Sequence, residues 1–270
     1  MIQFGVQMLG FLAASFAERT GAAMILMVQS ATLMVGAFAY FKLDVPYNKP
    51  DPTDHGILSQ ITESIAEGYR TVRASPPMRM VVIQNCAMGT FFMGSYIVTL
   101  PLLVRELYDG GSVELSWMNA ANSLGLITTI MLLLKFGDLH RQGRAPLLAQ
   151  AIGCFALAGA GLGFSFASLI GFVFAWGVCG GIAMTMSRTI MQEQAPVNQR
   201  SRMMAFFSFS FMGSGPVGAI LSGYMVEWFG VSTALMISSA SMFTVVAVVA
   251  LVSSLWRLEG HAARPVAAGS

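Results

Sequence analysis

Charged side chains are scarce in this chain. Only 10% of its 270 residues are Asp, Glu, Lys or Arg, whereas soluble domains carry roughly 25%. Hydrophobic residues make up 55% of the chain, and the mean hydropathy is +0.67. This composition excludes a soluble globular protein. It indicates an all-α membrane protein that crosses the bilayer several times, with lipid as its main partner.

Cysteine is also rare, and it stands where it does little chemistry. Cys86, Cys154 and Cys179 all lie inside apolar runs. An odd number of thiols at membrane depth argues against a disulfide framework or a zinc site. The chain also lacks a P-loop, an HExxH motif and paired intramembrane aspartates. We therefore expect no catalytic residues, no metal, no cofactor and no nucleic-acid partner, and we do not expect an enzyme.

Apolar runs long enough to cross about 30 Å of hydrocarbon are the main feature that is present. We expect eight transmembrane helices, at residues 2–17, 21–41, 79–104, 114–136, 145–166, 169–191, 203–227 and 231–256. If the N-terminus is cytoplasmic, every Lys and Arg except Arg19 and Arg105 falls on the cytoplasmic side. The sequence therefore predicts a multi-pass inner-membrane protein with both termini in the cytoplasm.

The longest connection, residues 42–78, divides the chain into a two-helix part (1–41) and a six-helix part (79–256). It opens with a Pro- and Asp-rich tether and continues with apolar residues at helical spacing, namely Ile57, Leu58, Ile61, Ile65, Tyr69 and Val72. We expect an amphipathic helix on the inner membrane surface, acting either as a linker or as a regulatory docking site. Residues 257–270 form a predicted cytoplasmic tail.

A weak internal repeat links the two parts. Residues 12–31 align with residues 221–240, with identities at Leu12, Glu18, Gly21, Leu26, Met27, Ser30 and Ala31, opposite Leu221, Glu227, Gly230, Leu235, Met236, Ser239 and Ala240. A repeat of the same orientation on either side of a long cytoplasmic loop predicts two similar six-helix halves. The first half would then have only its last pair of helices, so we expect an N-terminally truncated chain that lacks about four spans.

Glycine and proline interrupt the span at 203–227. Pro216 removes a backbone donor, and Gly213, Gly215 and Gly218 leave space beside it. We expect a kink or a close helix crossing here, which either flexes during function or is only a packing notch. Further glycines predict a close approach of the spans 145–166 and 169–191; they are Gly159, Gly161, Gly163, Gly177, Gly180 and Gly181.

Two stretches carry a resemblance to a known family. One runs through Arg188, Gln192, Pro196, Arg200, Arg202, Gly213, Pro216, Gly218 and Gly223. The other is the loop from Gly137 to Arg144, which resembles a G-x-x-x-D-R-x-G-R-R signature but lacks the Asp before Arg141 and the last basic residue. The chain resembles helices 5–12 of a 12-helix major facilitator superfamily transporter. It is most similar to the drug and siderophore exporters that include the enterobactin exporter.

The resemblance implies where the functional residues lie. The family lines its central cavity with the helices that correspond to the spans 79–104 and 169–191. The candidates for substrate contact are thus Gln84, Asn85, Thr185, Ser187 and Arg188, each of which can instead be a satisfied interhelical hydrogen bond. In the signature loop Gly137, Asp138, Arg141, Gly143 and Arg144 either hold the halves closed or form a tight turn with basic anchors.

The expected function is secondary active export of a small amphipathic molecule, of drug or siderophore type, by alternating access. No Asp, Glu or His lies inside any predicted span. If protons drive the transport, the titratable group is expected in the missing helices. The alternative is a non-transporting membrane protein, either an inactive fragment or a scaffold that assembles with another chain.

Overall fold

The computed structural model describes residues 22–41, 68–136, 143–196 and 199–252, and all regular elements within these ranges are helices. Their order is α3 (Ala22–Phe41), α5 (Pro76–Ala87), η1 (Met88–Met93), η2 (Ser95–Thr99), α6 (Leu100–Tyr108), α7 (Ser112–Phe136), α8 (Arg144–Gly161), α9 (Phe166–Gln194), α10 (Arg200–Met212), α11 (Gly215–Phe229) and α12 (Val231–Val252). The all-α prediction is confirmed. In lipid, a helix satisfies its backbone hydrogen bonds within one segment, which is why apolar runs fold this way.

Four helical stretches of the described residues are long and apolar enough to cross a membrane. They are Pro76–Tyr108, Phe166–Gln194, Arg200–Phe229 and Val231–Val252. The predicted spans 21–41, 114–136 and 145–166 correspond to the helices α3, α7 and α8, and their crossing of the bilayer stays a prediction. The predicted span 2–17 and the tail 257–270 lie outside the described residues, so the total of eight spans is also untested.

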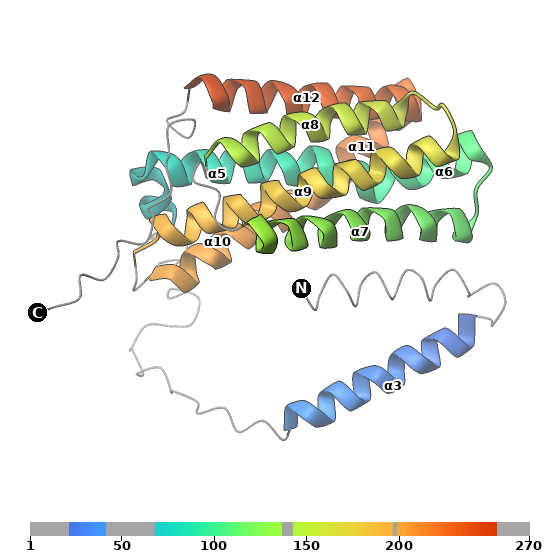
Figure 1. Cartoon of the computed structure of the whole chain (residues 1–270), viewed down its shortest axis with the longest axis horizontal. Helices are drawn as coiled ribbons and strands as arrows, with labels where there is room; N and C mark the ends of the chain where they lie inside the picture. Colours follow the sequence, from blue (N-terminus) through green and yellow to red (C-terminus); the bar gives the residue numbers. More distant parts are fainter. Residues whose placement is uncertain (1–21, 42–67, 137–142, 197–198, 253–270) are drawn as a thin grey trace, which may run out of the picture.

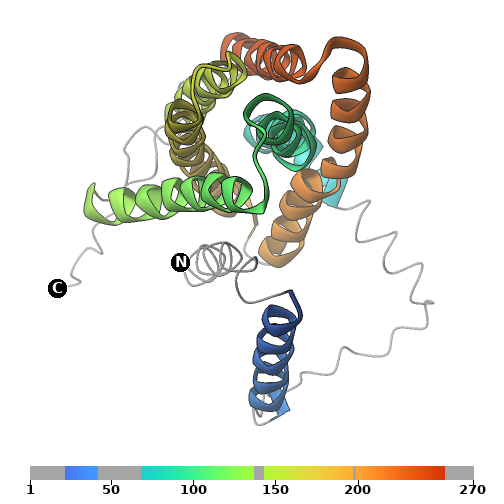
Figure 2. The same cartoon turned by 90° about the vertical axis from the view of Figure 1, so that its right-hand side faces the viewer.

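The stretch Pro76–Tyr108 is the centre of the six-helix unit. It joins α5, η1, η2 and α6 into one rod, and it is the most buried of the four stretches. The view along the helices in Figure 2 shows this rod surrounded by α8 to α12. Helix α7 packs mainly against α9, and it reaches the rod through α6 and through the side chain of Tyr96 in η2. The helix α3 stands beside the unit, and its described apolar side chains are exposed.

Local residues set the ends of these helices. Pro76 and Pro77 begin α5, where a missing backbone N–H costs nothing, so the span starts three residues before the predicted position 79. Ser165 caps α9 by accepting a hydrogen bond from the N–H of Ser168 at 3.2 Å. Asp109 takes the left-handed conformation with φ 46°, and Gly110 then donates to the carbonyl of Val104, which ends α6.

Glycines bring α7 and α9 into backbone contact. A methyl group on Gly177 would collide with the backbone of Asn122, and one on Gly125 would collide with the carbonyl of Phe174. The predicted close approach of α8 and α9 is confirmed, and a methyl group on Gly159 would collide with Phe172 of α9. Gly177 and Gly181 face α7 instead, the latter at Thr129, and Gly161 faces α12. The rotation of each helix decides which neighbour a glycine meets, and glycine spacing alone does not reveal that rotation.

Only the end of the predicted amphipathic helix lies within the described residues. Residues 68–74 are helical, and Val72 is buried in the core while Tyr69 is 56% exposed. Gly68 lies against Met203 and Phe206, so this turn packs on α10. Residues 42–67, which hold most of the predicted amphipathic helix, lie outside the described residues.

The two ends of the six-helix unit differ in charge. Among the described residues, every Lys and Arg except Arg105 lies at or near the left-hand end in Figure 1, where α5, α8 and α10 begin and α7 and α9 finish. These residues are Arg70, Arg73, Arg79, Lys135, Arg144, Arg188, Arg200 and Arg202. The opposite end, called the acidic end below, carries Glu106, Asp109, Glu114 and Glu227.

Candidate functional site

Asn85 is buried on α5 and contacts α10. Its side-chain amide donates to the hydroxyl of Ser210 at 2.8 Å and to the backbone carbonyl of Phe207 at 2.9 Å. Ser210 in turn donates to the same carbonyl at 2.7 Å. Both amide hydrogens are therefore engaged in holding two helices together, which leaves Asn85 little capacity to bind a substrate in this conformation.

Gln84 lies on the neighbouring face of α5 and reaches α8. It is 1% exposed, and its side-chain amide donates to the side-chain oxygen of Gln150. Gln150 then donates to the sulfur of Met88 at 3.5 Å. Sulfur is a weak acceptor, so the second of these hydrogen bonds contributes less than the one between the two amides. Gln150 was not among the predicted residues, because its position in α8 opposite Gln84 depends on the register between two helices.

The three candidates on α9 differ in accessibility. Ser187 is buried, Thr185 is half-buried, and Arg188 is exposed. Arg188 makes no hydrogen bond or ion pair with the part of the chain that the structure describes. Of the five predicted contact residues, it is the one whose charged group is both accessible and uncommitted, and a guanidinium presents a planar fork to carboxylates and similar anions.

The interrupted span forms two helices, α10 and α11, that separate at Gly213 and Ser214. Pro216 occupies the first turn of α11, where its missing donor is harmless. Gly218 packs directly on Thr90 and Gly94 of the π-helical part of the rod, because a methyl group on Gly218 or Gly94 would meet backbone atoms of the other helix. The feature is therefore a helix break followed by a close crossing.

The signature loop is visible only at its end. Gly137, Asp138 and Arg141 lie outside the described residues. Gly143 occupies the N-cap position of α8, and Arg144 is the first residue of that helix. This arrangement is compatible with either interpretation of the loop.

An aromatic cluster joins the rod to α9 and α7, and sequence reasoning did not find it. The ring centroids of Phe92 and Trp176 are 5.5 Å apart, and those of Tyr96 and Trp176 are 5.9 Å apart. The hydroxyl of Tyr96 donates to the side-chain oxygen of Asn119 at 2.6 Å. Asn119 is one of several polar residues in its span, and the aromatic partners carry no signal that distinguishes them from ordinary packing residues.

Some buried polar atoms near the rod have no hydrogen-bond partner among the described residues. They are the hydroxyls of Ser95, Thr99 and Ser239 and the indole nitrogen of Trp176. Two of them lie in η2, where the π-helical hydrogen-bond pattern replaces the α-helical one. Unpaired buried donors lower stability, and π-helical turns are frequent at functional sites. In η2 two such unpaired hydroxyls coincide with π-helical geometry.

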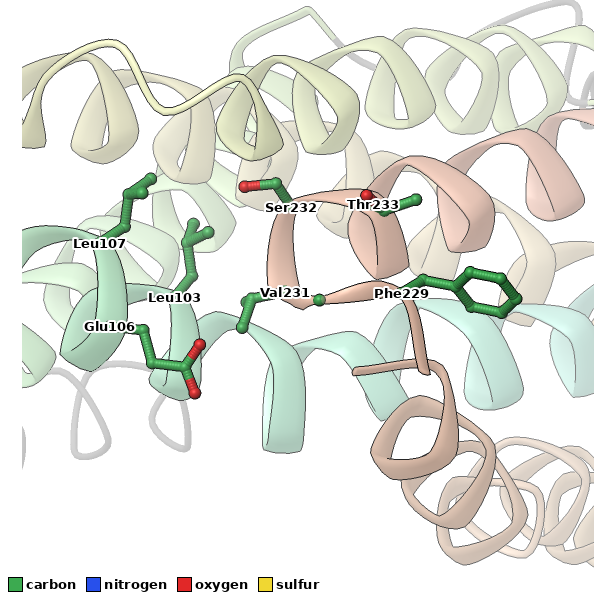
Figure 3. Close-up of a pocket in the computed structure, with 8 residues that line it drawn as sticks. Leu103, Glu106, Leu107, Phe229, Val231, Ser232 and Thr233 are labelled. Atoms are coloured by element: carbon green, nitrogen blue, oxygen red, sulfur yellow. The ribbon is translucent and has the colours of Figure 1, made fainter. Parts of the chain in front are cut away.

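A cavity of about 270 Å³ lies at the acidic end, away from the predicted contact residues. Figure 3 shows Leu103, Glu106 and Leu107 on α6, opposite the turn that joins α11 to α12. That turn contributes Phe229, Gly230, Val231, Ser232 and Thr233. Sequence reasoning missed this cavity because its two walls are far apart along the chain.

The comparisons with known proteins agree with this architecture. No curated protein matches the chain. The family model described as Major Facilitator Superfamily matches residues 86–269. The match covers more than half of the sequence and nearly all of the six-helix unit. That superfamily consists of multi-pass membrane transporters for small molecules. The chain therefore belongs to the Major Facilitator Superfamily.

Proposed function

We propose that the protein exports a small amphipathic molecule, of drug or siderophore type, by alternating access. The observation that carries the transporter assignment is the family match over the helices that surround the rod. Arg188 is the accessible charged residue on the helix that the family resemblance assigns to the cavity. A substrate with an anionic oxygen beside an apolar body suits an accessible guanidinium that has Met184, Met186 and Met191 near it along the helix.

The proposed orientation places the basic end of the unit in the cytoplasm of a cell with an inner membrane. Lys and Arg concentrate in cytoplasmic segments near the ends of membrane spans, and the described charges follow that asymmetry closely. Both termini are then cytoplasmic. Residues 42–78 serve as the cytoplasmic linker, and residues 79–256 form the C-terminal six-helix half.

The energy source is a separate proposal. Proton antiport needs a titratable group at membrane depth. In the described spans Glu106, Glu193 and Glu227 all stand near helix ends, and the middle of each span contains no Asp, Glu or His. Proton coupling, if it operates, therefore uses a carboxylate outside the described spans.

One observation favours the alternative of a non-transporting scaffold. The side-chain amides of Gln84 and Asn85 both donate hydrogen bonds to neighbouring helices. Polar residues used only for assembly suit a protein whose task is to hold helices together or to recruit another chain.

Efflux from sealed vesicles separates the two proposals. Proteoliposomes that contain the purified chain are loaded with fluorescent lipophilic anions and cations, and release is followed with and without a pH gradient. Release above that from protein-free vesicles supports export. If neither probe is released, and chemical cross-linking in native membranes captures a stable second polypeptide, the scaffold proposal replaces it.

A further inference from the structure

The cavity at the acidic end has the chemistry of a small amphipathic site. Its walls are mostly apolar, with Leu103 and Leu107 on one side and Phe229 and Val231 on the other. Glu106 is the one charged residue that lines it, and the hydroxyls of Ser232 and Thr233 are its other polar side-chain groups. In Figure 3 the carboxylate of Glu106 projects from α6 toward the side where Val231 stands.

The carboxylate of Glu106 is uncommitted. It makes no ion pair or hydrogen bond within the described part of the chain. Arg105, its neighbour in sequence, is exposed and does not line the cavity. The other charges described at this end are acidic, so a cation near the cavity gains from Glu106 directly and from Asp109, Glu114 and Glu227 at longer range.

The cavity lies at the level of the membrane interface. It adjoins the last turn of α6 and the turn from α11 to α12, where two membrane-spanning stretches finish. Exposed aromatic rings stand beside it: the centroids of Tyr224 and Trp228 are 6.0 Å apart, and Trp228 is 72% exposed. Tyr and Trp concentrate at this level in membrane proteins, so the molecules nearest to the cavity are phospholipid headgroups.

We infer that this cavity binds the ammonium headgroup of a phospholipid, with the ammonium against the carboxylate of Glu106. The glycerol and first acyl methylenes then lie against Leu107, whose side chain is 47% exposed. An ammonium donates up to three hydrogen bonds, and the two oxygens of a carboxylate are strong acceptors for them. The inference is independent of transport, since it concerns the outer surface of the six-helix unit.

The test compares two phospholipids that differ in headgroup charge. The detergent-solubilised full chain is titrated with phosphatidylethanolamine, which carries an ammonium, and with phosphatidylglycerol, which carries none. Native mass spectrometry measures the two dissociation constants. The variant is Glu106→Gln, which keeps the size of the side chain and removes its charge. The matched control is Glu227→Gln, which removes an exposed carboxylate from the same end that does not line the cavity.

We expect the wild-type chain to bind phosphatidylethanolamine about fivefold more tightly than phosphatidylglycerol, which is the scale of one exposed ion pair. Glu106→Gln should abolish this preference, and Glu227→Gln should keep it. Equal affinities in the wild type overturn the inference, as does an equal loss in both variants, which indicates a general charge effect. Saturable binding of tetraethylammonium, which has no acyl chain, would reassign the cavity to a soluble cation.

Discussion

Asn85 on α5 and Ser210 on α10 are joined by a hydrogen bond of 2.8 Å that is buried between the two helices. The pair lies 125 residues apart in sequence. It connects the central rod to the first half of the interrupted span. Asn85, for which the sequence left open either substrate contact or an interhelical hydrogen bond, makes such a hydrogen bond in this conformation.

The first prediction treats Asn85 and Ser210 as a structural pair. A double-mutant cycle with Asn85→Ala and Ser210→Ala should show a coupling of about 0.6 kcal/mol, the average for interhelical hydrogen bonds within membranes. Denaturant unfolding in mixed micelles measures it. No coupling, together with loss of substrate binding in Asn85→Ala alone, would restore Asn85 to the cavity.

The second prediction concerns Gln84 and Gln150. Replacing either one by Leu leaves the other with an unpaired amide in the core, at a cost of about 1–3 kcal/mol. Replacing both removes donor and acceptor together, so the double variant should be more stable than either single variant. Thermal unfolding in detergent provides the comparison. A double variant that is as unstable as the sum of the two singles contradicts the pairing.

The third prediction uses two glycines of α11 that differ in their surroundings. Gly218 is pressed against the backbone of Thr90, whereas Gly223 has open space where a methyl group would stand. Gly218→Ala should force the helices apart and lower stability by about 1–3 kcal/mol, the usual cost of overpacking. Gly223→Ala should be neutral or slightly stabilising, since alanine favours helix more than glycine does. Equal stability of the two variants in a melting assay would contradict the crossing.

The fourth prediction separates binding from folding at Arg188. Because its side chain is exposed, Arg188→Gln should leave the melting temperature unchanged while it lowers substrate affinity by about tenfold, which corresponds to one charge-assisted contact. Arg200→Gln is the control, since Arg200 is also an exposed arginine at the basic end. The affinity is read from the concentration dependence of vesicle efflux. If both variants lose affinity equally, the effect is surface charge and not contact.

Helix positions were predictable because hydrocarbon imposes a length and a composition on each crossing. The predicted ends at 79 and 104 of the central rod differ from the observed Pro76 and Tyr108 only because prolines start a helix and because Asp109 stops one. The break near Pro216 was also predictable, because glycine and proline act on the conformation of their own backbone.

Contacts between helices were not predictable from one sequence. Gln84 and Asn85 are adjacent, yet one faces α8 and the other faces α10. Predicting which helix each residue faces requires knowing how α5, α8 and α10 are rotated about their axes. The π-helical turns from Met88 to Thr99 make the problem harder, because they shift the face that each following residue presents. The same shift hid the aromatic cluster around Trp176.

The charge asymmetry of the two ends bears on how the chain enters the membrane. In the proposed orientation, the turns at the acidic end are the parts that must be moved through the hydrocarbon during synthesis. The turn between α8 and α9, residues 162–165, carries no charged side chain, and the turn between α11 and α12 is a single glycine, Gly230. The α8–α9 pair can therefore insert as a hairpin whose leading tip loses little hydration, while Arg144 and Arg188 remain on the side of the ribosome.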